Sequence, residues 1–156
     1  MLKKLFIIII LIFIITGCSL EQASLIVNID GNEEIIDVET IYSHEEAVTF
    51  PAVVRSSGEK PVETSYKGIE LTKLFETLDI DISNYKKVTF NAYDGYRVIL
   101  SIEEIIEPSN AYLTFERDNE LLKTKKLGGN GPFQLIIRRD PFSQRWIKHV
   151  NEIILQ

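Results

Sequence analysis

Basic side chains near the C-terminal end of the chain are its strongest candidates for binding chemistry. They lie within twelve residues of one another: Arg138, Arg139, Arg145, Lys148 and His149. Arginine presents a planar fork of donors that fits phosphate or carboxylate groups, so the cluster suits an anionic ligand. Two interpretations stay open. Either the cluster binds a small anion, or it reflects ordinary strand alternation in which Arg145 and Lys148 pair with acidic neighbours.

Other candidate residues have weaker patterns. A glycine-rich loop at 128–131 follows Lys123, Lys125 and Lys126, and its backbone amides could cradle an anion. It does not follow a strand and open a helix, as phosphate loops do, so we interpret it as a solvated turn. Tyr93, at the expected tip of a hairpin, is a candidate for exposed recognition.

No pattern predicts a metal site or a catalytic unit. The two histidines, His44 and His149, are far apart, and no spacing of histidine, cysteine and acidic residues matches a set of metal ligands. The sequence contains neither a recognisable Ser–His–Asp arrangement nor a paired-carboxylate pattern. We therefore assign no catalytic residue.

The single cysteine, Cys18, ends an apolar N-terminal segment. Lys3 and Lys4 precede eleven apolar residues at 5–15, which is shorter than the ~20 residues of a membrane-spanning helix. The pattern resembles a bacterial lipoprotein signal peptide over residues 1–17, with Thr-Gly-Cys as the end of its lipobox. This resemblance implies a lipidated Cys18, a tether over residues 18–24, and a domain held on the extracytoplasmic face of the cell membrane.

The composition of the remaining chain limits its partners. Removal of residues 1–17 leaves 139 residues with 15 basic and 23 acidic side chains, a formal balance of −8. This length fits a single domain over residues 25–156. The acidic balance argues against nucleic acid as a partner, because phosphate neutralisation needs a basic face.

Short strands and short helices must position these residues. Hydrophobic periodicity and turn signals predict strands at 25–29, 34–38, 112–116, 121–122, 133–138 and 146–155, and a helix near 71–78. Capping-box patterns, a serine followed three residues later by glutamate, predict further helix starts at Ser43 and Ser101. Few strands are joined by helical crossovers, so we predict an α+β fold with a mostly antiparallel sheet.

The register of one hairpin, over residues 87–101, can be predicted. A three-residue loop ending at Gly95 pairs Phe90 with Val98 and segregates apolar from polar side chains, whereas a two-residue loop mixes the faces. Gly95 is then expected in the left-handed conformation. The same register predicts that Tyr96 lies in the core.

The order of these segments resembles the sulfite oxidase-type molybdopterin-binding domain, over roughly residues 62–155. The motifs that carry the resemblance lie at 66–75, 88–106, 111–122, 129–137 and 145–153. The resemblance implies the same fold. It also implies that the loop after the strand at 133–138 and the Trp-Ile-Lys segment lie near a pterin or substrate.

One departure from the family affects the expected function. In the family's enzymes a cysteine thiolate of the protein binds molybdenum, but Cys18 is the only cysteine here and is assigned to lipid. Serine hydroxyls are hard donors that replace a thiolate poorly. We therefore expect a domain that binds a ligand or partner without turning it over, and no bound cofactor. The expected ligand is a small anion, a pterin-like molecule or an envelope redox protein, with Arg138, Arg145, Lys148, His149 and Tyr93 as candidate binding residues. The alternative is a molybdopterin-dependent oxidoreductase of the cell envelope.

Overall fold

The computed structural model describes residues 23–156, so the predicted signal peptide, Cys18 and most of the predicted tether lie outside the described residues. The described residues begin with a hairpin of β1 (Ser24–Ile29) and β2 (Asn32–Asp37), close to the two strands predicted at 25–29 and 34–38. The other elements are α2 (Val38–Tyr42), β3 (Val48–Val54), β4 (Val62–Glu70), α3 (Leu71–Thr77), η2 (Ile82–Asn84), β5 (Lys87–Ala92), β6 (Arg97–Ser101), α4 (Ile102–Ile106), β7 (Ala111–Arg117), β8 (Glu120–Leu121), η3 (Lys125–Leu127), β9 (Gln134–Ile137), η4 (Ser143–Arg145) and β10 (Val150–Leu155).

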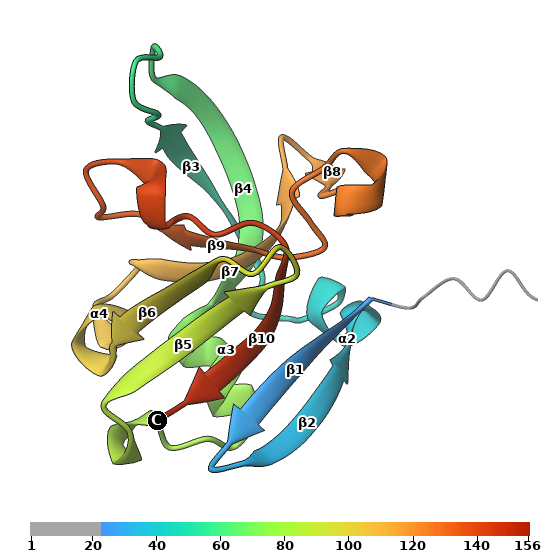
Figure 1. Ribbon diagram of the computed structural model, residues 1–156, viewed down its shortest axis with the longest axis vertical. Coiled ribbons are helices and arrows are strands. Elements are labelled where there is room, and N and C mark those ends of the chain that lie inside the picture. Colours follow the sequence, from blue (N-terminus) through green and yellow to red (C-terminus); the bar gives the residue numbers. More distant parts are fainter. Residues whose placement is uncertain (1–22) are drawn as a thin grey trace, which may run out of the picture.

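The strands form two sheets (Figure 1). The first sheet has the order β2-β1-β10-β5-β6, and the second has the order β3-β4-β7-β8 with β9 also paired to β7. Strand β1 runs parallel to β10, and the other pairs are antiparallel. The predicted α+β fold with mostly antiparallel pairing is confirmed.

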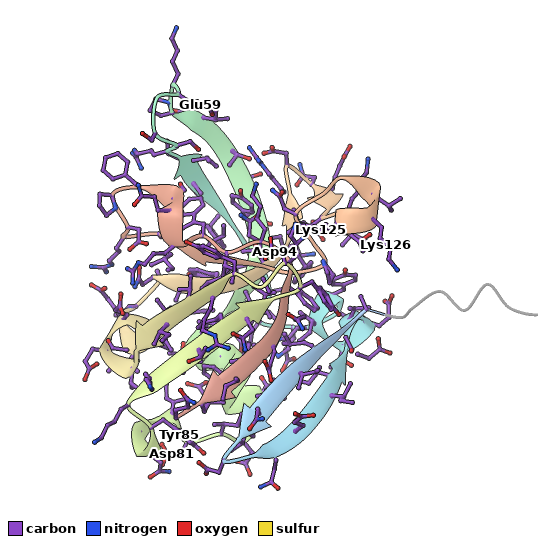
Figure 2. The ribbon with its side chains drawn as sticks, viewed as in Figure 1. Glu59, Asp81, Tyr85, Asp94, Lys125 and Lys126 are labelled. Carbon is purple, nitrogen blue, oxygen red and sulfur yellow. The ribbon has the colours of Figure 1, made fainter. Side chains whose placement is uncertain are left out.

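One cluster of buried apolar side chains includes residues from both sheets and from α3. Phe90, Phe115 and Phe75, from the first sheet, the second sheet and α3, are each fully buried. Burial of one such side chain contributes about 1.5–3 kcal/mol relative to leaving it in water. The shared core thereby fixes the second sheet, whose β3–β4 hairpin extends away from the rest of the molecule (Figure 1). Figure 2 shows Glu59 at the outer end of that hairpin and Asp81 at the opposite end of the molecule.

The hairpin of β5 and β6 has the predicted register. Phe90 pairs with Val98, and Gly95 has a φ of 83°. The prediction that Tyr96 lies in the core is wrong, because 54% of its surface is exposed. Its hydroxyl donates to the carbonyl oxygen of Gln144 at 3.3 Å, so the tyrosine links the hairpin tip to the η4 turn and does not fill the core.

The two capping-box predictions had different outcomes. Ser101 and Glu104 form the predicted capping box at the start of α4. No helix starts at Ser43, which instead ends α2. The helix forms one turn earlier because Asp37 caps it and because Val38 and Ile41 bury their side chains.

The last predicted strand is shorter than expected. Strand β10 begins at Val150, because His149 has a φ of 58° and interrupts extended structure before it. The preceding Trp146 is buried, and its indole N–H donates to the carbonyl oxygen of Ile137 at 2.8 Å. This bond holds the segment after β9 against the end of that strand. Within residues 23–156, no helix has the length and apolar character needed to cross a membrane.

Candidate functional site

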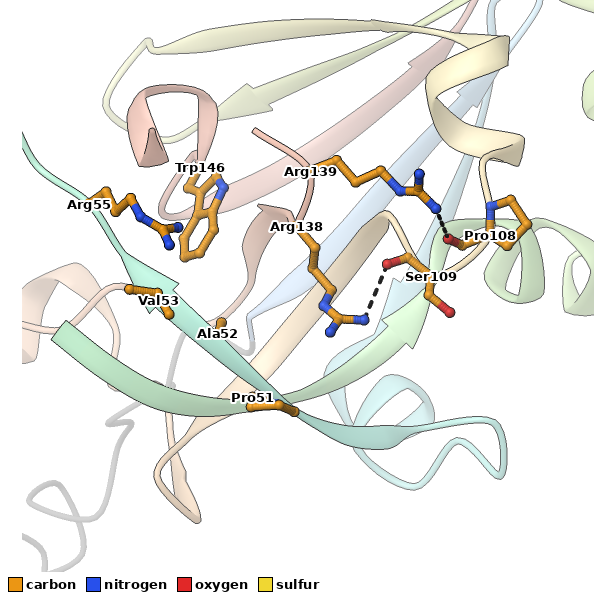
Figure 3. Close-up of a pocket in the computed structure, with 9 residues that line it drawn as sticks. All are labelled: Pro51, Ala52, Val53, Arg55, Pro108, Ser109, Arg138, Arg139 and Trp146. Atoms are coloured by element: carbon orange, nitrogen blue, oxygen red, sulfur yellow. Dashed lines mark hydrogen bonds between the residues drawn. The ribbon is translucent and has the colours of Figure 1, made fainter. Parts of the chain in front are cut away.

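A hollow of about 410 Å³ lies between the edge strand β3 and the loops around the end of β9 (Figure 3). Three arginines line it: Arg55 after β3, and Arg138 and Arg139 after β9. The indole of Trp146 and three consecutive residues of β3, 51–53, form its more apolar side. None of the described residues that line it is acidic. The hollow therefore combines concentrated positive charge with an apolar wall.

Aromatic rings of the core support the hollow beside Trp146. The Trp146 ring meets Tyr66 edge-on at a centroid distance of 6.1 Å, and Phe50 lies 4.3 Å from Tyr112. Burial raises the pKa of Tyr66, so this ring stays neutral at physiological pH. Packed aromatic rings of this kind give the neighbouring arginines a rigid support.

Arg138 contacts this aromatic support directly. Its guanidinium carbon lies 5.1 Å from the centroid of the Phe50 ring, a cation–π contact. Nη1 donates to the carbonyl oxygen of Ser109 at 3.3 Å, and no described carboxylate pairs with the group. Since a guanidinium has five N–H donors, several remain to bind an anion.

Arg55 is held through its backbone. Its N–H donates to Oγ of Ser143 at 2.9 Å, and the N–H of Ser143 donates back to the Arg55 carbonyl oxygen at 3.1 Å. In the described part of the chain, no carboxylate pairs with its guanidinium. The backbone of Arg55 is thus fixed while its cationic head stays available.

Arg139 is partly neutralised. Nη1 pairs with Glu107 at 2.6 Å, and Nη2 donates to the carbonyl oxygen of Pro108 at 3.3 Å. Its backbone N–H donates to Asn110. It therefore adds less positive charge to the hollow than Arg138 or Arg55.

Arg145 has a different environment. It pairs with Glu104 at 2.7 Å and makes two bonds to the carboxylate of Asp140. Hydrogen bonding to Asp140 raises the pKa of Arg145 further above its usual value. Partial burial acts to raise the pKa of Glu104, but hydrogen bonds from Ser101 and Arg145 outweigh this and leave it below its usual value. Arg145 thus ties α4 to the loop after β9 and does not line the hollow.

The other three predicted binding residues lie elsewhere. His149 is buried, its Nδ1 is 3.0 Å from the Gly131 carbonyl oxygen, and its N–H donates to the Asn130 carbonyl oxygen at 2.8 Å. Its own carbonyl oxygen accepts from the N–H of Tyr93, at the exposed hairpin tip. Lys148, which directly precedes His149, is exposed. The structure brings His149 and Tyr93 together and leaves both outside the hollow.

Close backbone packing explains the glycines of the 128–131 loop. A Cβ on Gly129 would lie 2.1 Å from the Lys123 carbonyl oxygen, and one on Gly131 would lie 2.2 Å from the Leu122 carbonyl oxygen. Any side chain at either position would require the backbone to move. This requirement accounts for these two glycines without a bound phosphate.

Sequence reasoning missed Arg55 as a lining residue. Arg55 begins a polar loop and has no neighbour in sequence that indicates binding. Only the curvature of the second sheet, which brings the edge of β3 opposite the end of β9, places Arg55 beside the other two arginines (Figure 3). The family resemblance implied that the segment beginning at Trp146 lies near a ligand, and Trp146 does line the hollow, although it was not named as a binding residue.

Comparison with known proteins supports the fold. No family model and no curated protein matches the chain. Among solved structures, the sulfane dehydrogenase SoxCD from Paracoccus pantotrophus is similar, with a TM-score of 0.68 and 15% identity. The match covers 89% of this chain and 39% of that one, so this chain spans well under half its length. At this identity the likeness concerns the fold alone, and it is compatible with the sulfite oxidase-like domain that the motifs predict.

The residues of the hollow can be tested against the molybdopterin cofactor of that family. Residues 23–156 contain no cysteine, and they include no group of three or more histidine or acidic side chains placed to hold a metal. Guanidinium groups donate hydrogen bonds to anions and offer no lone pair to a metal. The hollow therefore suits a phosphate or carboxylate but does not fit a molybdenum centre that needs a protein thiolate.

Proposed function

We propose that this chain is a lipid-anchored envelope protein whose sulfite oxidase-like domain binds an anionic ligand in the arginine-lined hollow without transforming it. One observation carries the proposal. The guanidinium groups of Arg55 and Arg138 line a single hollow, and neither has a carboxylate partner within residues 23–156. The predicted mature chain has 23 acidic and 15 basic side chains, so acids that could neutralise them are abundant.

The physical basis is the charge-assisted hydrogen bond. An arginine fork binds carboxylate or phosphate oxygens with two parallel N–H donors, and such bonds are about twice as strong as neutral ones. The ring of Phe50 covers one face of the Arg138 guanidinium, so the edge that carries the donors stays accessible. Because the Arg138 guanidinium is already held by Phe50 and Ser109, binding an anion costs little further ordering of that side chain.

Binding of simple anions tests the proposal. Isothermal titration with sodium sulfate, sodium phosphate and sodium benzoate at constant ionic strength should show one site per chain. The double variant R55Q/R138Q should lose that binding. The control variant R97Q removes one positive charge from β6, where Arg97 bonds to Asn91, and should bind like the wild type. Equal binding by all three proteins would refute the proposal.

The anchor is a separate part of the proposal and has its own test. It is supported by the lipobox pattern that ends at Cys18. The wild-type protein should fractionate with membranes and carry a mass increase from acyl chains at its mature N-terminus. C18S should lack this mass increase. An unmodified Cys18 in the wild-type protein would refute lipid anchoring and leave the binding proposal standing.

A second candidate function is that of an oxidoreductase. The structural similarity to the sulfane dehydrogenase SoxCD favours it, since that protein is a dehydrogenase. Protein purified from a host that makes molybdopterin separates the two candidates by molybdenum analysis and a visible spectrum. Stoichiometric molybdenum would favour the enzyme. A folded, colourless, metal-free protein that binds anions would favour the binding module.

A further inference from the structure

The free edge of β3 forms one wall of the hollow. Strand β3 is the outermost strand of the second sheet and pairs only with β4. Three consecutive residues, Pro51, Ala52 and Val53, line the hollow. Side chains alternate between the faces of a strand, so a run of three lining residues means that the backbone edge itself faces the hollow.

The direction of the backbone groups along this edge follows from the pairing of Pro51 with Ser65. The Ser65 N–H donates to Oδ1 of Asp118 at 2.9 Å, and its carbonyl oxygen accepts from the Asp118 N–H, also at 2.9 Å. Both groups therefore point away from β3, and Pro51 and Ser65 form a non-hydrogen-bonded pair. In such a pair the groups of the facing residue also point outward. The Pro51 carbonyl oxygen thus lies on the free edge.

The same alternation applies to every second residue. Val53 is two positions on, so its N–H and carbonyl oxygen also point to the free edge. Arg55 is two further positions on, and its outward N–H and carbonyl oxygen are paired with Ser143, as this alternation requires. No described group bonds to the outward N–H and carbonyl oxygen of Val53. The loop that contains Ser143 thus pairs with the free edge of β3 at Arg55. The same edge stays open at Val53 and Pro51.

We propose that the hollow receives the carboxyl-terminal end of a peptide, which extends β3 by strand addition and places its terminal carboxylate against Arg138. The inference rests on the proposed function, because the same arginines would bind the anion. An added strand bonds to the backbone of an edge strand, and a terminal carboxylate is recognised by clustered donors. The hollow offers both kinds of contact.

The geometry also assigns a direction and a length. Arg138 stacks on Phe50, near the start of β3, whereas Arg55 lies just past its end. A peptide with its carboxylate at Arg138 therefore runs antiparallel to β3. Pro51 has no N–H, and Ser143 occupies the edge at Arg55, so only a short stretch can pair. A volume of about 410 Å³ suits an organic ligand of a few residues, and an inorganic oxyanion would leave most of it empty.

Short peptides used as probes test this inference on the full-length protein in detergent. The probe is acetyl-tetraalanine with a free carboxylate, compared with its carboxamide, with a form N-methylated at its internal peptide nitrogens, and with acetate. We expect the free acid to bind about tenfold more tightly than the carboxamide, the N-methylated form and acetate, because each loses a hydrogen-bonded contact. Equal affinity of the free acid and the N-methylated form would overturn strand addition.

Two variants at Val53 provide a matched comparison. V53P removes the outward N–H, whereas V53A keeps it and shortens the side chain. V53P should bind the peptide no better than acetate, while V53A, which keeps the outward N–H, should still bind it more tightly than acetate. If V53P does not fold, the N-methylated peptide makes the same test on the wild-type protein. If sulfate and acetate bind but the peptide binds no more tightly than acetate, the inference fails and the proposed function stands; if no probe binds, both fail.

Discussion

Arg138 and Arg145 are seven residues apart in sequence, both follow β9, and they have opposite environments. Arg145 is bonded to two carboxylates, those of Asp140 and Glu104. Arg138 has a ring beneath it and one backbone carbonyl oxygen beside it. The difference shows that a basic cluster in sequence can contain both an arginine paired with carboxylates and an arginine without a carboxylate partner in the described part of the chain. What separates the two is which acids the fold brings within reach.

The acids at Arg145 come from two separate elements. Glu104 is fixed by the capping box of α4, where its side chain also accepts from the Ser101 N–H at 3.0 Å. Asp140 lies in the loop after β9, and its side chain is only 10% exposed. A carboxylate with so little solvent needs a cation nearby, because an unpaired charge there would be strongly destabilising. Arg145 therefore serves to neutralise these carboxylates and to stabilise the fold.

The largest expected effect comes from breaking that tie. R145Q leaves Asp140 without its cation, and we expect the free energy of unfolding to fall by about 2 kcal/mol, less than for a fully buried pair because Arg145 is partly exposed. Anion affinity should change less than twofold. Urea denaturation at pH 7 and anion titration measure the two quantities. A loss of binding with unchanged stability would reverse the roles assigned to the two arginines.

R138Q should have the opposite effect. Removal of a charge-assisted donor should weaken sulfate or benzoate binding about tenfold, corresponding to about 1.4 kcal/mol. The free energy of unfolding should change by less than about 1 kcal/mol, since the lost interactions are the ring contact and one bond to a backbone carbonyl oxygen. Titration of R138Q beside R145Q checks both sides of the comparison. A destabilised R138Q with intact binding would contradict it.

Much of the fold could be predicted because its signals are local. The alternation of apolar residues set the register of Phe90 with Val98, and the capping box at Ser101 marked the start of α4. The prediction that Tyr96 lies in the core was wrong, because the burial of this residue depends on how far the hairpin tip extends past the core. The prediction of a helix that starts at Ser43 was wrong because the preceding residues form α2 instead, which buries Val38 and Ile41.

The site was less predictable because it is not local. Arg138 was among the predicted binding residues, but Arg55 follows β3 and is separated from Arg138 by more than eighty residues. Only the curvature of the second sheet brings them to one hollow. The partners of Arg145 follow from the packing of α4 against the loop after β9, which no spacing in the sequence encodes. The charge pattern predicted a basic cluster, and tertiary packing determined that Arg138 and Arg139 line the hollow whereas Arg145, Lys148 and His149 do not.

The pH dependence of stability sharpens the account of the tie. The folded-state pKa of Glu104 lies below its usual value, so its contribution to stability is complete above about pH 4.3 and is lost as the pH falls through that pKa. E104Q should therefore lose less stability than the wild type between pH 6 and pH 3. The difference should be about 1 kcal/mol or less, because the group is partly exposed. Urea denaturation across this range measures it, and parallel curves would show that Glu104 contributes nothing.

The smallest expected effect concerns Arg139, whose environment is intermediate between those of the other two arginines. It lines the hollow like Arg138 but pairs with Glu107 as Arg145 pairs with its acids. Because Glu107 already offsets its charge, R139Q should weaken anion binding only about two- to threefold, or about 0.5 kcal/mol.

E107Q should release Arg139 and strengthen binding by a similar factor, since it removes a competing anion at the rim of the hollow. R139Q lowers and E107Q raises the net charge by one, so R97Q, which lowers it by one outside the hollow, is the control for total charge. If R139Q matched R138Q in its effect, the ion pair with Glu107 would not govern which arginines are available to a ligand.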